Sequence, residues 1–86
     1  MQKISVCVIA RNAEKTLENC LNSIFSQSLK PTEIIVVNDA SIDSTKIIAE
    51  KFDAQLIDLK KNLGTGKARS IAAIAASNEI IASIVK

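Results

Sequence analysis

The chain has 86 residues, with 11 Lys+Arg against 9 Asp+Glu and a net charge of +2, which fits one small domain. The weak charge and the two aromatic residues, Phe25 and Phe52, argue against nucleic-acid binding, which uses strong basic patches and aromatic stacking. The chain contains no histidine, which excludes His-based nucleophilic catalysis and most zinc sites. Cys7 and Cys20 lack metal-ligand spacing, and we interpret them as core residues rather than a disulfide pair.

Targeting and membrane signals are weak. The first ten residues lack a basic segment followed by a long apolar one, as a signal peptide requires. The apolar tail, residues 71–85, is interrupted by Ser77, Asn78 and Glu79 and falls short of the roughly 20 apolar residues of a membrane span. We therefore predict a cytoplasmic chain without a transmembrane segment.

The first element is an apolar run rich in β-branched residues, KISVCVIA, which predicts a strand over 3–10. Arg11 and Asn12 follow it, and Asn12 is a candidate helix N-cap. Apolar residues then recur with helical spacing, at 13, 17, 20, 21, 24 and 25. They predict a helix over 13–27 that ends before Pro31.

The next strand, predicted over 33–38, contains four consecutive β-branched residues, 34–37. Such a run indicates a strand covered on both faces. A polar cluster, Asn38 to Asp43, comes directly after it. A helix over 44–52 and a short strand over 54–59 follow.

A turn-rich loop over 60–66 leads to an alanine-rich helix over 66–76 and a last strand over 79–85. Strands and helices alternate along the whole chain, which is typical of a parallel sheet. We predict one α/β domain, residues 1–86, with an open parallel sheet of four strands in the order 3-2-1-4 and helices on both faces.

The polar cluster lies where ligands bind in open α/β sheets, at the carboxyl end of a strand. Asp39 offers a carboxylate that accepts hydrogen bonds from a base or a ribose. The alternative is that Asp39, Ser41 and Asp43 only form a turn and cap the next helix.

The segment Gly64-Thr65-Gly66-Lys67 matches neither a phosphate loop nor a dinucleotide fingerprint. A helix N-terminus with Lys67 and Arg69 nevertheless suits a pyrophosphate. The alternative is a helix start with solvated basic residues.

Three segments together carry a family resemblance: SVCVIARNAEKTLENCLNSIFSQSLKPTEIIVVNDASIDST, NLGTGKARSIA and NEIIA. They resemble the N-terminal, nucleotide-binding half of family 2 glycosyltransferases with the GT-A fold. The resemblance implies binding of a UDP- or GDP-sugar. By position, Asp39 would contact the base, while Ile9, Ala10 and Arg11 would line the base and ribose.

The resemblance also places Lys67 and Arg69 near the ribose or pyrophosphate, and makes Asp43 the cap of the following helix. Ile9, Ala40 and Ser70 depart from residues that are frequent in the family, which are proline, glycine and asparagine. The Asp-x-Asp metal motif of the family would follow the strand that begins at Glu79, where this sequence reads EIIASIVK.

We therefore assign no catalytic residue and no metal ligand, and expect Mn²⁺ or Mg²⁺ only in a full-length family member. The chain is interpreted as a truncated form without the metal motif and catalytic base, inactive in sugar transfer when isolated. A non-catalytic α/β interaction or oligomerisation domain is the alternative, and an unrelated flavodoxin-like binding domain is a third. The apolar last strand, residues 79–85, has few charges at its edge, so we also predict a homodimer or oligomer through it.

Overall fold

A computed structural model describes residues 3–27 and 31–86 of the chain. The elements alternate between strand and helix, as the sequence predicts. In chain order they are β1 (Ile4–Ala10), α1 (Leu17–Phe25), β2 (Glu33–Asp39), α2 (Thr45–Glu50), β3 (Gln55–Leu59), α3 (Thr65–Ala75) and β4 (Glu79–Val85).

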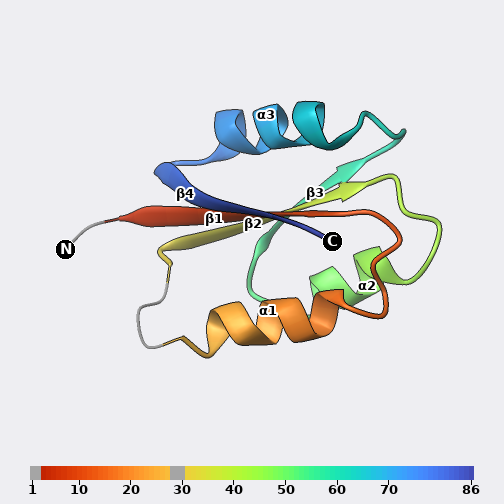
Figure 1. Ribbon diagram of the computed structural model, residues 1–86, viewed down its shortest axis with the longest axis horizontal. Coiled ribbons are helices and arrows are strands. Elements are labelled where there is room, and N and C mark those ends of the chain that lie inside the picture. The colour runs from red at the N-terminus through yellow and green to blue at the C-terminus, as the bar shows by residue number, and fades with distance from the viewer. Residues whose placement is uncertain (1–2, 28–30) are drawn as a thin grey trace.

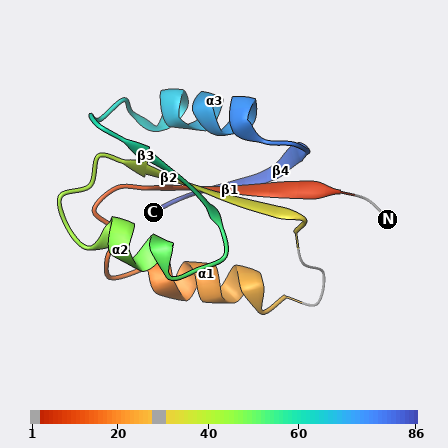
Figure 2. The ribbon, with the colours of Figure 1, turned by 180° about the vertical axis from the view of Figure 1, so that it is seen from behind.

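The four strands form one parallel sheet in the order β3-β2-β1-β4. Helices α1 and α2 cover one face of the sheet and α3 covers the other (Figure 1). The view from behind shows the same three layers (Figure 2). The predicted fold class and strand order are therefore confirmed.

The central strands β1 and β2 are buried on both faces, which explains their near-continuous runs of β-branched residues. Alternate side chains of each strand enter two separate cores, because successive residues point to opposite faces. The core beneath α1 and α2 includes Val6, Val8, Leu17, Leu21, Ile34 and Val36. The core beneath α3 consists of Cys7, Ile9, Ile35, Val37, Ala68 and Ala72.

The start of α1 differs from the prediction. The helix begins at Leu17, four residues after the predicted start, and Asn12 is not its N-cap. Residue Ala13 instead accepts the N–H groups of Thr16 and Leu17 in a turn, and Asn12 has a left-handed φ of 49°. Ala13 lies in the connecting loop but is buried. Its apolar side chain therefore extended the helical spacing in the sequence beyond the true start of the helix.

The carboxyl ends of all four strands meet at one end of the sheet, on the right in Figure 1. The chain continues beside β1 beyond the end of β4. Lys86 donates its N–H to the carbonyl of Ile9 at 2.9 Å and accepts the N–H of Arg11 at 3.1 Å. The backbone of Arg11 is therefore fixed against the last residue of the chain.

Candidate functional site

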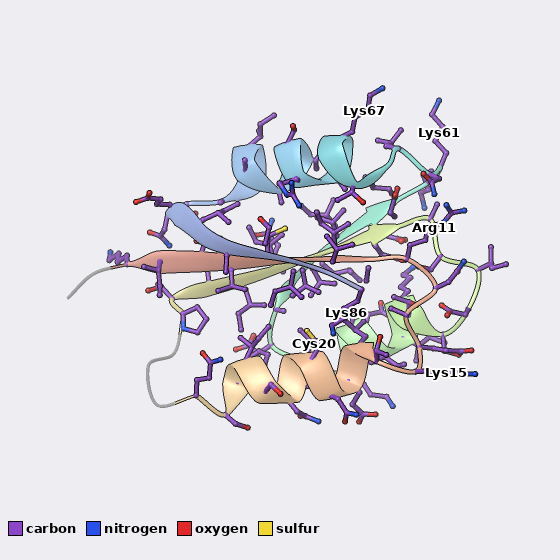
Figure 3. The ribbon with its side chains drawn as sticks, viewed as in Figure 1. Arg11, Lys15, Cys20, Lys61, Lys67 and Lys86 are labelled. Carbon is purple, nitrogen blue, oxygen red and sulfur yellow. The ribbon has the colours of Figure 1, made fainter. Side chains whose placement is uncertain are left out.

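The loops after β1, β2 and β3 all lie at the carboxyl end of the sheet, where α/β proteins bind their ligands. Arg11, Lys61 and Lys67 come from three different segments: Arg11 and Lys61 lie at this end of the molecule, and Lys67 lies near the start of α3 and points away from the sheet (Figure 3). All three are exposed. The end of the sheet is consequently rich in cationic groups that are accessible to an anion.

Asp39, the last residue of β2, is buried beneath this surface with 3% of its area exposed. Its Oδ1 accepts the N–H of Leu63 at 2.8 Å and its Oδ2 accepts the N–H of Gly64 at 3.1 Å. Gly64 directly precedes α3 and has a φ of 88°, a conformation that favours glycine. Asp39 therefore anchors the start of α3, a role that the sequence analysis did not identify.

Each oxygen of an ionised carboxylate accepts more than one hydrogen bond. The two bonds to the loop thus leave lone pairs on Asp39 for a further donor. The predicted contact between Asp39 and a base remains a prediction, to which the structure adds the role of a loop anchor.

The predicted site residues of β1 differ in exposure. Ile9 and Ala10 have 3% and 0% of their area exposed, and Ile9 packs in the core beneath α3. Arg11 is exposed at the end of the strand. Among these three residues, only Arg11 offers its side chain to a ligand in this structure.

Lys67 and Arg69 lie two positions apart at the start of α3, so they point to different sides of the helix. Lys67 points away from the sheet (Figure 3). The charge of Arg69 reaches the buried thiol of Cys7 in β1: burial raises the pKa of this thiol, and Arg69 partly opposes that effect. Lys67 and Arg69 are both exposed and lie on different sides of α3 rather than side by side.

A chain of hydrogen bonds joins the loops after β1 and β2 to the end of β3, and sequence reasoning did not identify it. Asn12 donates its N–H to Oγ of Ser41 at 2.9 Å, and its Oδ1 accepts the N–H of Ile42 at 3.0 Å. Asn38 accepts the N–H of Ser41 at 3.3 Å and donates from Nδ2 to Asp58 at 2.9 Å. The loop after β1 is thereby connected to the end of β3 through the loop after β2.

Lys46 completes this network with an ion pair to Asp58, at 3.3 Å. Burial tends to raise the pKa of Asp58, but the hydrogen bonds from Asn38 and Lys46 and the charges of Lys46 and Lys60 outweigh it, so the pKa is lowered. Asp58 is therefore held as an anion at neutral pH.

A second set of contacts joins the segment before α1 to the start of α2. Asp43 accepts the N–H groups of Thr45 and Glu14, at 2.9 and 3.3 Å, and the hydroxyl of Thr45. In return, Glu14 accepts the N–H of Ser44 at 3.2 Å. The N-cap position of α2 is Ser44, so Asp43 lies one residue before the predicted capping position, although its carboxylate accepts the N–H of the first helical residue. The hydrogen bonds to Asp43 lower its pKa, chiefly the one from the Thr45 hydroxyl.

A hollow of about 440 Å³ opens beside this network. Its lining comes from the ends of β2 and β3, the connecting loops and α2, and consists of Asn38, Ala40, Ser41, Ile42, Asp43, Lys46, Ile47, Asp58, Leu59 and Lys60. None of the six predicted site residues lines it. The hollow lies on the α2 face of the sheet, whereas Lys67 and Arg69 belong to α3 on the opposite face.

Divalent cations such as Mn²⁺ and Mg²⁺ require several oxygen ligands. Within residues 3–27 and 31–86, no three or more acidic or cysteine side chains gather as such a ligand set would. The described residues therefore do not fit a metal site. In the same part of the chain, no helix has the length and apolarity to cross a membrane.

The sequence was compared with known families and proteins. The model of the family described as "Glycosyl transferase family 2" matches residues 5–84. The teichoic acid poly(glycerol phosphate) polymerase of Staphylococcus epidermidis is 36% identical over 78 residues, which are 84% of this chain and 11% of that protein. The poly(ribitol-phosphate) beta-N-acetylglucosaminyltransferase TarS of Staphylococcus aureus is 36% identical over 88 aligned positions, with 94% of this chain and 15% of that protein covered.

Among solved structures, glucosyl-3-phosphoglycerate synthase from Mycobacterium tuberculosis is similar, with a TM-score of 0.78 and 27% identity. That structure contains Mn²⁺, UDP and glucosyl-3-phosphoglycerate, and the match covers 94% of this chain and 33% of that one. The present chain thus spans a third or less of the length of these proteins. With the fold and an almost complete family match in agreement, the chain belongs to glycosyl transferase family 2.

Proposed function

We propose that the chain is the part of a family 2 glycosyltransferase that binds the nucleotide of a UDP- or GDP-sugar. The observation that carries this proposal is the arrangement around Asp39: a buried carboxylate at the end of β2, anchored to the start of α3. Exposed Arg11 lies at the same end of the sheet, and exposed Lys67 lies in the first turn of α3, just after the loop that Asp39 anchors. The UDP in the similar mycobacterial synthase supports the assignment of ligand class.

The chemistry of each group suggests its role. A free lone pair of Asp39 would accept an N–H of the base, and the cationic side chains of Arg11, Lys67 and Arg69 would neutralise the pyrophosphate. Because Lys67 and Arg69 point to different sides of α3, we expect only one of them to approach a given phosphate group closely. Ile9 and Ala10 would contribute backbone or support rather than side-chain contacts.

Titration with UDP and GDP tests the proposal. We expect saturable binding by the wild-type chain, measured from amide chemical shifts, with the largest changes in the loops after β1, β2 and β3. Lys67→Ala should weaken binding about three- to tenfold, since a charged hydrogen bond contributes about 1.5–3 kcal/mol when fully formed and less when exposed. Lys51→Ala is the matched control, because Lys51 is an exposed lysine at the far end of α2.

Asp39→Ala should weaken nucleotide binding by about 1–3 kcal/mol, the cost of losing a charged hydrogen-bond partner. The same change releases the N–H groups of Leu63 and Gly64, so stability must be measured in parallel. Equal affinity in the folded wild-type and Asp39→Ala proteins would show that Asp39 is only a loop anchor. Absence of binding to both nucleotides would favour the alternative, a non-catalytic interaction domain.

We further propose that the chain alone does not transfer sugar, because no described residue is placed to act as general base for an acceptor hydroxyl. The check is release of UDP or GDP from a nucleotide sugar by purified protein, which should stay at background. The cytoplasmic location stays a prediction.

We also propose that the isolated 86-residue chain forms a homodimer through β4. This strand is at one edge of the sheet, and an edge strand exposes N–H and C=O groups that pair with another chain. A C2 pair of β4 strands would cover both edges at once. The test of this arrangement is given in the Discussion.

A further inference from the structure

Asn12 occupies an unusual place between two loops of the candidate site. Its φ of 49° lies in the left-handed region, which asparagine tolerates better than most residues. That backbone turn allows its N–H to reach Oγ of Ser41 and its Oδ1 to reach the N–H of Ile42. One residue thus makes two hydrogen bonds, in opposite directions, to the loop after β2.

The neighbours of these contacts are the residues of the proposed nucleotide site. Arg11 precedes Asn12, and Asp39 and Ala40 precede Ser41 in the loop that Asn12 holds. Asn38 extends the connection to Asp58 at the end of β3. Asp39 separately connects the end of β2 to the start of α3. Strand pairing of Ala10 with Asn38 and the bonds to Lys86 hold the backbone up to Arg11. Beyond Arg11, the two loops are joined by side-chain bonds, and Asn12 supplies two of them.

We propose that Asn12 is a positioning residue for nucleotide binding: it fixes the loop that carries Arg11 against the loop that follows Asp39, without contacting the ligand itself. This inference depends on the proposed function for its ligand. Its physical basis is that a binding group held by a rigid support loses less conformational entropy when the ligand binds. Loss of the support loosens the loop that follows Arg11, so the Arg11 side chain spends less time in the binding position. Affinity then falls although every residue that contacts the ligand is still present.

The central variant is Asn12→Gly, which retains access to the left-handed backbone but removes the amide side chain. Asn12→Asp is the rescue variant, because its carboxylate retains an acceptor for the N–H of Ile42. Glu14→Ala is the matched control. It removes a hydrogen bond of similar exposure, to Ser44, between the same two parts of the chain, but one that does not adjoin Arg11.

Two measurements are made on each variant: UDP and GDP affinity under conditions where the protein is folded, and amide hydrogen exchange of Ile42. In Asn12→Gly we expect faster exchange at Ile42 and about tenfold weaker nucleotide binding, a change of about 1.4 kcal/mol. Asn12→Asp should recover most of the affinity. Glu14→Ala should lose stability and keep the wild-type affinity. If Asn12 had only a structural role, Asn12→Gly would behave in the same way.

Wild-type affinity in folded Asn12→Gly would overturn the inference. If the wild-type chain binds neither nucleotide, the proposed function fails. The hydrogen exchange of the Ile42 amide then still tests whether Asn12 holds the two loops together. Unchanged exchange at Ile42 in Asn12→Gly would show that the asparagine does not hold the two loops together, and would overturn the inference on its own. The Leu63 amide, held by Asp39, serves as an internal reference that should not change.

Discussion

At the scale of single residues, Ala40 has a backbone conformation that its side chain disfavours. Its φ is 57°, and for residues with a Cβ the left-handed region costs about 1–2 kcal/mol. Glycine removes that cost, but it also gives the unfolded chain more conformational freedom, which lowers the free energy of unfolding by about 0.4–1 kcal/mol. We therefore expect Ala40→Gly to raise the free energy of unfolding by about 0.5–1 kcal/mol, as measured by urea denaturation.

The control for this change is Ala73→Gly. Ala73 is exposed within α3, where glycine costs about 1 kcal/mol relative to alanine. The same chemical change should thus have opposite signs at the two positions. A loss of stability in Ala40→Gly comparable to that in Ala73→Gly would contradict the argument.

Asp43 provides a prediction about pH. Hydrogen bonds from Thr45 and Glu14 lower its pKa below the ordinary value of 3.8. Because the folded pKa lies below the unfolded one, the ionised group stabilises the protein above pH 3.8, and this contribution is lost as the pH falls through the folded pKa. Urea denaturation at several pH values between about 6 and about 2.5 should show this acid-sensitive part of the stability curve.

In Asp43→Asn the corresponding part of the pH dependence should be missing, since an amide does not titrate in this range. The lowered pKa of Asp58 contributes in the same direction, so some acid sensitivity remains in the variant. An identical pH profile for Asp43→Asn and wild type would show that Asp43 does not contribute.

The residue scale is also where sequence reasoning about the site was least complete. Asp39 and Arg11 could be singled out because they directly follow apolar strands. The anchoring of Leu63 and Gly64 by Asp39 joins residues 24 and 25 positions apart, and no local pattern encodes such a contact. The burial of Ile9 and Ala10 likewise depends on α3 and on neighbouring strands, which become adjacent only in the folded chain.

At the scale of elements, one buried hydroxyl joins the segment before α1 to the start of α2. Thr45 has no exposed area, and its Oγ1 accepts the N–H of Ala13 at 2.8 Å while donating to Asp43. Thr45→Val has nearly the same shape but leaves the N–H of Ala13 without an acceptor. We expect a loss of about 1–3 kcal/mol, the cost of an unsatisfied buried polar group.

Thr45→Ser tests the hydroxyl separately, because it retains the oxygen and loses a methyl group worth about 1 kcal/mol. Hydrogen exchange of the Ala13 amide distinguishes the two variants: it should accelerate in Thr45→Val relative to global unfolding and remain protected in Thr45→Ser. Equal protection of Ala13 in both variants would refute the role of the hydroxyl.

Strands were more predictable than helices at this scale. The predicted and observed strands differ by at most one residue at either end, because apolar β-branched runs are bounded directly by polar residues. The helix prediction over 13–27 was longer than the observed α1, and that over 44–52 was longer than the observed α2. Before α1, Ala13 and Glu14 donate their N–H groups to the distant residues Thr45 and Asp43, which stabilises a non-helical turn. At the end of α2, Lys51 and Phe52 donate their N–H groups to carbonyls three positions back.

At the scale of the whole molecule, the two edge strands of the sheet are β3 and β4. Only part of β4 is suited to pairing with a second copy, because the register of β4 against β1 shifts near its start, and such irregularities disfavour edge pairing. The carboxyl half of β4 is regular, and Val85 is 50% exposed there. The proposed dimer contact therefore involves the residues from 82 onward.

Backbone geometry identifies the groups that face outward. Lys86 uses both its N–H and its C=O on β1, and alternate residues of a parallel strand bond to the same neighbour. Ile84 and Ala82 thus also face β1, whereas Ser83 and Val85 direct their N–H and C=O groups to the open edge. Ser83 is exposed, so its substitution by proline removes an outward donor without removing a bond to β1.

We expect the 86-residue chain to be dimeric at high concentration and Ser83→Pro to shift it to monomer, because each strand of an antiparallel pair needs its outward donors. Ser83→Thr keeps the N–H and should remain dimeric. Light scattering gives the mass, which should fall from twice the chain mass of 9.2 kDa to that value, and circular dichroism confirms that the proline variant is folded. A wild-type chain that stays at 9.2 kDa at high concentration would exclude the dimer, and an undiminished dimer in folded Ser83→Pro would place the contact elsewhere than on the β4 edge.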